Sequence, residues 1–142
     1  MLVSELMSAS VVSVTPDDTA LEASRLLDRY NIGSLPVCTA TGALRGIITD
    51  RDIVTRCLAA ERDPSKTPVR DVMSKSVLSV APDDDVREAG HKMATGRVRR
   101  IPVAENCRLV GMITLGDIAA SQSFSMETSA TLAEISSTLS HL

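Results

Sequence analysis

The chain contains one sequence pattern twice, and this internal repeat limits its possible folds more than any other feature. Three segments recur in the same order: VSELMSASVVSVTPDD at 3–18 and VRDVMSKSVLSVAPDD at 69–84, LPV at 35–37 and IPV at 101–103, and GIITDRDI at 46–53 and GMITLGDI at 111–118. The copies are 66 residues apart up to the prolines of the second pair and 65 apart afterwards, so the intervening loop has lost one residue. Two copies predict a pair of similar units, with candidate sites in the clefts between them.

Length and composition determine what kind of core these copies can build. A chain of 142 residues fits one compact domain. A copy of about 60 residues would be marginally stable alone, so we expect the two copies to pack together. Tyr30 and Phe124 are the only aromatic residues, so the core must consist of aliphatic side chains, Met and Ala. The scarcity of aromatic residues and the net charge of −3 argue against nucleic-acid binding and a membrane-binding surface.

The cysteines and the hydropathy pattern point to a soluble protein of the cytoplasm. Cys38, Cys57 and Cys107 lie outside any C-x-x-C pattern and do not coincide between copies, which argues against a disulfide framework or a zinc site. We interpret them as small buried hydrophobic residues. The sequence shows no signal peptide and no apolar run of about 18 residues, so we expect no membrane partner.

Each copy predicts a turn of helix followed by the elements β-α-β-β-α. Apolar residues at i, i+3 and i+4 predict the opening turn, and β-branched runs at 11–14 and 77–80 predict a first strand. The next helix runs to residues 30 and 95, with a capping-box pattern at Thr19-Ala-Leu-Glu22 and with Gly33 and Gly96 helping to end it. Two strands joined by a hairpin turn follow in each copy, at 35–38 and 44–48 and at 101–104 and 109–113.

A closing helix begins at Thr49 in the first copy and at Thr114 in the second. The sequence therefore predicts a mixed α/β (α+β) fold with one copy at 1–60, a polar linker at 61–68, a second copy at 69–121 and a C-terminal extension at 122–142. Leu132, Ile135 and Leu139 predict a weakly amphipathic C-terminal helix in the extension, and a frayed tail is the alternative.

The repeated pattern resembles the tandem CBS domain (the cystathionine β-synthase motif pair, or Bateman module). The motifs that carry the resemblance are V-x-D/E-hydrophobic-M, L/I-P-V and G-hydrophobic-hydrophobic-T-x-x-D, which occur twice, in order, over residues 1–121. The resemblance implies two β-α-β-β-α repeats packed sheet to sheet with pseudo-twofold symmetry. It also implies AMP, ADP, ATP or S-adenosylmethionine as a regulatory ligand in the clefts, and a homodimer.

Two Thr-x-x-Asp turns, Thr49–Asp52 and Thr114–Asp117, are the first candidate sites. A threonine three residues before an acid at a helix start is a capping box, which explains both turns without a ligand. The family resemblance implies in addition that Asp52 and Asp117 bind the two ribose hydroxyls, to which a carboxylate is well suited.

Arg99 and Arg100 are candidate phosphate ligands, because a planar guanidinium matches a phosphate group. A solvated basic strand edge is the simpler interpretation. The first copy has Gly33 and Ser34 at the matching positions, so we expect two unequal clefts. One cleft would combine Thr49 and Asp52 with the two arginines, and a neutral cleft would combine Ser34 with the second Thr-x-x-Asp turn.

The remaining candidates come from the resemblance, which implies that backbone and aliphatic groups beside the proline of the L/I-P-V motif bind adenine. These residues are Pro36, Ile101 and Pro102, with Ser13, Val14, Ser79 and Val80 from the first strands. The prolines are also expected to lie at strand edges and to end the pairing there, since proline donates no ladder bond.

No nucleophile elbow, metal-ligand cluster or glycine-rich phosphate loop is present, so we expect neither an enzyme nor a resident cofactor or metal. The function predicted is a regulatory module: an adenine nucleotide binds, changes the repeat or dimer packing, and an unidentified regulated protein senses the change. The alternative is a ligand-free structural module for dimerisation.

Overall fold

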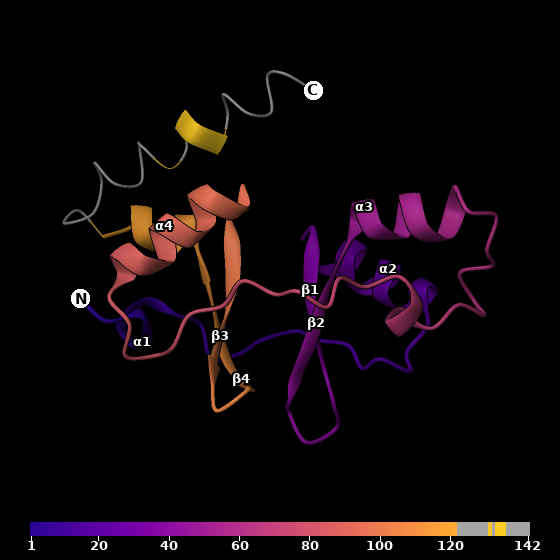
Figure 1. Ribbon diagram of the computed structural model, residues 1–142, viewed down its shortest axis with the longest axis horizontal. Coiled ribbons are helices and arrows are strands. Elements are labelled where there is room, and N and C mark those ends of the chain that lie inside the picture. The colour runs from indigo at the N-terminus through magenta and orange to yellow at the C-terminus, as the bar shows by residue number, and fades with distance from the viewer. Residues whose placement is uncertain (122–130, 132, 136–142) are drawn as a thin grey trace. The chain divides into compact units, whose positions relative to one another are not determined.

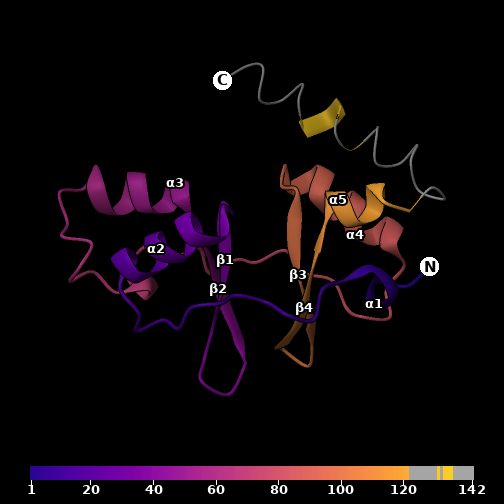
Figure 2. The same ribbon diagram turned by 180° about the vertical axis from the view of Figure 1, so that it is seen from behind.

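The structure, a computed structural model, describes residues 1–121, 131 and 133–135, and the chain forms two compact units. Unit 1 consists of Met1–Val11 and Leu78–Leu142, and unit 2 consists of Val12–Val77. The predicted mixed α/β fold is confirmed: the described residues form two small antiparallel sheets with helices (Figures 1 and 2).

Unit 2 is built on the hairpin of β1 (Ser34–Cys38) and β2 (Leu44–Thr49), which pair in antiparallel register. Its helices are α2 (Ala20–Tyr30), α3 (Asp50–Ile53), the π-helix η1 (Val54–Leu58) that continues α3, and the 3₁₀ turn η2 (Val69–Asp71). The Thr19 capping box is present: Thr19 Oγ1 accepts from the Glu22 backbone N–H at 3.1 Å, and the Glu22 carboxylate accepts from the Thr19 N–H at 3.4 Å.

Unit 1 repeats this plan with β3 (Arg100–Glu105) paired to β4 (Arg108–Thr114). Its helices are α1 (Val3–Leu6), α4 (Val86–Gly96) and α5 (Leu115–Ala119). Both hairpin turns that the sequence predicts are present, with positive φ at Gly42 in unit 2 and at Asn106 and Cys107 in unit 1.

The opening segment of each copy belongs to the unit that contains the other copy's hairpin. Ser8, from the start of the chain, exchanges two backbone hydrogen bonds of 2.9 Å with Met112 of β4. Ser74, from the start of the second copy, exchanges the same two bonds with Ile47 of β2, also at 2.9 Å. The sequence repeats and the structural units are therefore different divisions of the chain, and the repeat boundaries stay a prediction.

The first strands expected at 11–14 and 77–80 were wrong: each is a single parallel bridge, Val14 to Val37 and Val80 to Val103. Val14 N–H donates to Pro36 O (3.1 Å) and Cys38 N–H donates to Val14 O (2.8 Å). The next ladder bond would need an N–H on Pro36, which proline does not have. Pro102 stands in the same relation to Val80, whose N–H donates to its carbonyl at 3.1 Å.

Two smaller expectations were also wrong. The hairpin pairing continues past both prolines, to Cys38 and Glu105, so the prolines stop the neighbouring segment rather than their own strands. Asn31 (φ 52°) and Arg97 (φ 56°), not Gly33 and Gly96, take the left-handed position that ends α2 and α4. Asn tolerates this conformation well.

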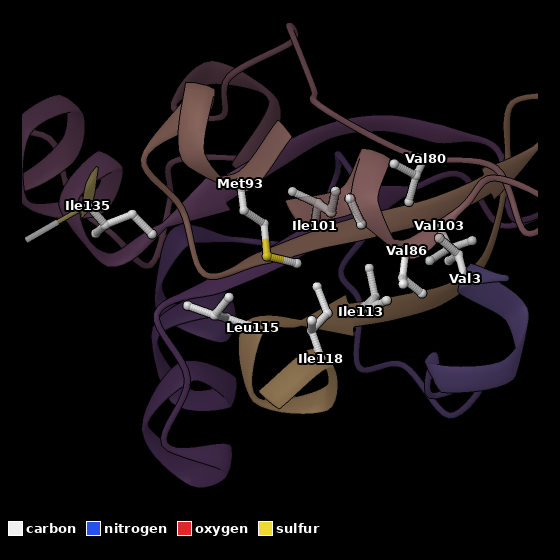
Figure 3. Packing of buried hydrophobic residues seen from close by; sticks show 11 residues of the cluster. Val3, Val80, Val86, Met93, Ile101, Val103, Ile113, Leu115, Ile118 and Ile135 are labelled. Carbon is white, nitrogen blue, oxygen red and sulfur yellow. The ribbon is translucent and has the colours of Figure 1, made fainter. Parts of the chain in front are cut away.

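Each unit has its own aliphatic core, as the composition predicts. The unit 1 cluster includes Val3, Met93, Ile101 and Ile113 (Figure 3). Cys38 and Cys57 are buried as expected, and burial raises the pKa of the Cys38 thiol, which disfavours the reactive thiolate. The expectation was wrong for Cys107, which is exposed because it lies in the β3–β4 turn.

The predicted C-terminal helix is described only in part: residues 131 and 133–135 are helical. Leu132 and Leu139, on which the prediction also rests, lie outside the described residues.

Gly111 is required by a close backbone approach. A Cβ on Gly111 would lie 2.9 Å from Ser8 O and 2.7 Å from Met7 Sδ, so the opening segment would have to move. We expect Gly111→Ala to lower the free energy of unfolding by about 1–3 kcal/mol. Gly90→Ala is the control, because its Cβ would be no closer than 3.9 Å to Thr131 Oγ1 and helical Ala is favoured over Gly. Equal effects in urea denaturation would contradict this explanation.

Candidate functional site

Both Thr-x-x-Asp turns form complete capping boxes. In unit 2, Thr49 Oγ1 accepts from Asp52 N–H and Asp52 Oδ2 accepts from Thr49 N–H, both at 3.0 Å. In unit 1, Thr114 and Asp117 form the same pair of bonds at 3.0 and 2.9 Å. Each box uses only one of the two carboxylate oxygens, Oδ2. Helix capping and ligand contact through the other oxygen, Oδ1, are therefore compatible.

The two aspartates differ in their surroundings. Asp52 is 9% exposed, and its Oδ1 lies 3.8 Å from Nη1 of Arg56, one helical turn further on. Asp117 is half-buried and lies near a cation from another element, Arg100. Each carboxylate thus has a neighbouring guanidinium, supplied by a helix in unit 2 and by a strand in unit 1.

The structure places Gly33–Ser34 and Arg99–Arg100 at matching positions, as the repeat offset predicts. Gly33 O accepts from Asp50 N–H at 3.1 Å, and Arg99 O accepts from Leu115 N–H at 2.7 Å. In the sheets, Ser34 pairs with Thr49 and Arg100 pairs with Thr114. The residue beside the capping threonine is therefore a short hydroxyl in unit 2 and a guanidinium in unit 1.

Arg100 is the least satisfied polar residue of this region. Its Nε is buried and has no hydrogen-bond partner among the described residues. Burial lowers the pKa of Arg100, and the charge of Asp117 partly opposes this shift. The guanidinium nevertheless stays protonated at neutral pH. A buried N–H without an acceptor is destabilising, and an anionic oxygen is the acceptor to which a guanidinium is best suited.

The other predicted residues lie in the hairpins or in the segments that precede them, one set in each unit. In unit 2, Ser13 is exposed, while Val14 and Pro36 are buried and share a backbone hydrogen bond. In unit 1, Val80, Ile101 and Pro102 are buried, and Ser79 is half-buried. Each unit thus brings its own set of candidates together. The predicted combination of Thr49 and Asp52 with the two arginines joins residues of different units and stays a prediction.

Sequence analysis missed two basic residues. Arg56 Nη1 donates to the carbonyls of Val72 and Met73, both at 3.1 Å, and its spacing of four from Asp52 could have revealed it. Lys92 of α4 donates from Nζ to Ser79 O at 2.7 Å. No sequence signal points to that contact, because it depends on how α4 packs.

Comparison with known proteins settles the family. A family model described as CBS domain matches residues 3–59 and 69–123. The chain belongs to the CBS domain family. The two matched stretches are the two copies of the sequence repeat, so the resemblance that the motifs indicated is confirmed.

Several similar proteins match most of the chain. The CBS domain-containing protein YhcV of Bacillus subtilis is 37% identical over 134 residues, which is 94% of either chain. A crystal structure of Hypoxic Response Protein I with two coordinated zinc ions has a TM-score of 0.78 at 32% identity, over 84% of this chain and 98% of that one. The CBS domain pair of protein MJ0100, in complex with 5′-methylthioadenosine and S-adenosylmethionine, has a TM-score of 0.72 at 29% identity, over 84% and 98% of the two chains.

Two kinds of feature are absent from the part of the chain that the structure describes. No group of three His, Cys, Asp or Glu side chains there could hold a metal ion. None of its helices is long and apolar enough to cross a membrane.

Proposed function

We propose that this CBS protein is a regulatory module that binds adenosine-containing ligands, and that its unit 1 site prefers ligands with an anionic group. The observation that carries the proposal is Arg100: a half-buried guanidinium with a buried, unpartnered Nε lies near the Asp117 carboxylate at a helix start. A ligand with a diol and an anionic oxygen would complement both groups. AMP, ADP, ATP and S-adenosylmethionine all have this combination.

Each aspartate would contribute ribose binding through the oxygen that its capping box does not use. Asp52 would act in this way in unit 2, where Ser34 in place of Arg100 makes a neutral ligand such as 5′-methylthioadenosine the better match. The solved CBS pair of MJ0100 supports the ligand class, since it is described in complex with both a neutral and a charged adenosine derivative.

Signalling would follow from linkage. A ligand that prefers one arrangement of the module shifts the population toward it, and a regulated protein or a second copy of the chain senses the shift. Oligomerisation is compatible with the family, because a hexameric CBS-CP12 protein is among the solved relatives, at 28% identity. A homodimer in the cytoplasm remains our proposal for this chain.

A ligand-free module for dimerisation is the second candidate, and one observation favours it. Both Thr-x-x-Asp turns form complete capping boxes, which explain their presence without a ligand. This candidate leaves the unpartnered Arg100 Nε unexplained.

A thermal-shift panel with 5′-methylthioadenosine, AMP, ATP and S-adenosylmethionine separates the two candidates. At a ligand concentration of 100 Kd, binding stabilises the fold by about 2.7 kcal/mol, which raises Tm by about 5–10 °C. We expect AMP and S-adenosylmethionine to do so, and Asp117→Ala to reduce the shift. Glu22→Ala is the matched control, because it removes a capping-box acid outside the candidate sites. An unchanged Tm with every ligand at millimolar concentration would refute the proposal.

A further inference from the structure

The helical segment of residues 131 and 133–135, called here the C-terminal segment, packs on unit 1 with one face. Thr131 and Ile135 are 6% and 2% exposed, whereas Ala133 and Glu134 are exposed. Residues four apart lie on the same side of a helix, so Thr131 and Ile135 form the docked face. In Figure 3 the Ile135 side chain extends from this segment toward Met93 of α4.

Gly90 forms the place on α4 where the C-terminal segment docks. It is buried, and a Cβ added there would lie 3.9 Å from Thr131 Oγ1, so a larger side chain would meet Thr131. The corresponding fifth residue of α2 in unit 2 is Ser24, whose hydroxyl donates to Ala20 O at 2.8 Å. The two helices are alike in length, and only α4 has the glycine at this position.

Ile135 joins the same hydrophobic cluster as the residues that support the candidate site. Leu115 and Ile118 lie on either side of Asp117 in α5, and Ile101 follows Arg100 in β3. The buried cluster of unit 2 is drawn from residues 14–72 and includes Cys57 of η1. In unit 1 the C-terminal segment adds Ile135 to the cluster that contains the neighbours of Arg100 and Asp117.

We propose that the C-terminal segment is a regulatory strap of unit 1, whose docking on α4 and ligand binding beside Arg100 and Asp117 favour one another. The inference rests on the proposed function. A ligand that contacts both residues holds α5 against β3, and Leu115, Ile118 and Ile101 of these elements share one hydrophobic cluster with Ile135. Ligand binding therefore lowers the free-energy cost of docking the C-terminal segment. Because the coupling is reciprocal, docking of the segment favours ligand binding to the same extent. Release of the strap would then report an empty site to a partner.

The test measures AMP affinity by calorimetry in an Asp52→Ala background, so that binding reports on unit 1. We expect Ile135→Ser and Gly90→Leu each to weaken AMP binding by about fivefold or more, the size of a typical coupling. Ala133→Ser is the matched control on the exposed face of the segment and should stay within about twofold. Gly90→Leu leaves the sequence of the segment intact and suits a helix, so it separates undocking from damage to the segment itself.

Hydrogen exchange of the amides at 133–135 provides the second measurement. We expect AMP to slow this exchange in the Asp52→Ala protein and to have no such effect in Ile135→Ser. If AMP binds but neither the exchange nor the affinity differs among the variants, the proposed coupling of the strap to ligand binding is wrong, while the proposed function stands. If AMP does not bind in the Asp52→Ala background, the proposed site for anionic ligands in unit 1 is wrong, and the proposed coupling is wrong as well.

Discussion

Replacing Arg100 with methionine should lower the affinity for AMP and S-adenosylmethionine by about 10–100-fold, because charge-assisted hydrogen bonds contribute about 1.5–3 kcal/mol each. The affinity for 5′-methylthioadenosine, which has no anionic group, should change by less than about threefold. The measurement is calorimetry with each of the three ligands. A uniform loss for all three would mean that Arg100 only supports the fold.

Stability gives an independent check on Arg100. Its Nε is buried without a partner, so an apolar side chain of similar length should leave the unliganded protein as stable as before or slightly more stable. Arg97→Met is the control for net charge, because Arg97 is exposed and belongs to the same basic cluster. If Arg97→Met weakens AMP as strongly as Arg100→Met, general electrostatic attraction explains the preference instead.

Local sequence patterns predicted the elements that depend on local contacts. The capping boxes at Thr19, Thr49 and Thr114 all form, since a threonine and an acid three residues later satisfy each other's backbone N–H. The hairpins follow from apolar strands around Gly42 and the Asn106-Cys107 turn. In these places the predicted and observed boundaries of the elements differ by one or two residues.

The sequence could not predict tertiary contacts, which depend on which distant segment packs against a given segment. Pro36 and Pro102 limit the first strands because they cannot donate the next hydrogen bond to the neighbouring segment. The sequence of the first strand itself does not reveal this limit. For the site, the pattern identified the capping residues and the arginine pair. Burial of the Arg100 Nε and the contacts of Arg56 follow from packing, so only the structure reveals them.

The sequence repeat does not show that the opening segment of each copy packs in the unit that contains the other copy's hairpin. Val3 and Val69 occupy the same place in the two copies, and both are fully buried. Because both copies carry the same pattern, the sequence alone assigns Val3 to the first copy by proximity. In the structure Val3 belongs to the cluster of unit 1 and Val69 to that of unit 2.

Val3→Asp should therefore destabilise the hairpin β3–β4, more than 90 residues away in the sequence, rather than the nearby β1–β2. An unpaired charge in a core costs on the order of 3–5 kcal/mol, which is comparable to the whole stability of a domain. Val69→Asp should have the reverse effect and destabilise β1–β2. Hydrogen exchange resolved by segment measures both, because local opening raises exchange first where the core is damaged.

Ser4→Asp is the control: it adds the same charge at an exposed position of α1, where an acid is favourable, and should change the exchange little. Faster exchange of β1–β2 in Val3→Asp would mean that each opening segment packs with its own copy. The reciprocal result would establish that each core needs residues from both copies, so that neither copy could fold, or bind a ligand, when separated from the other.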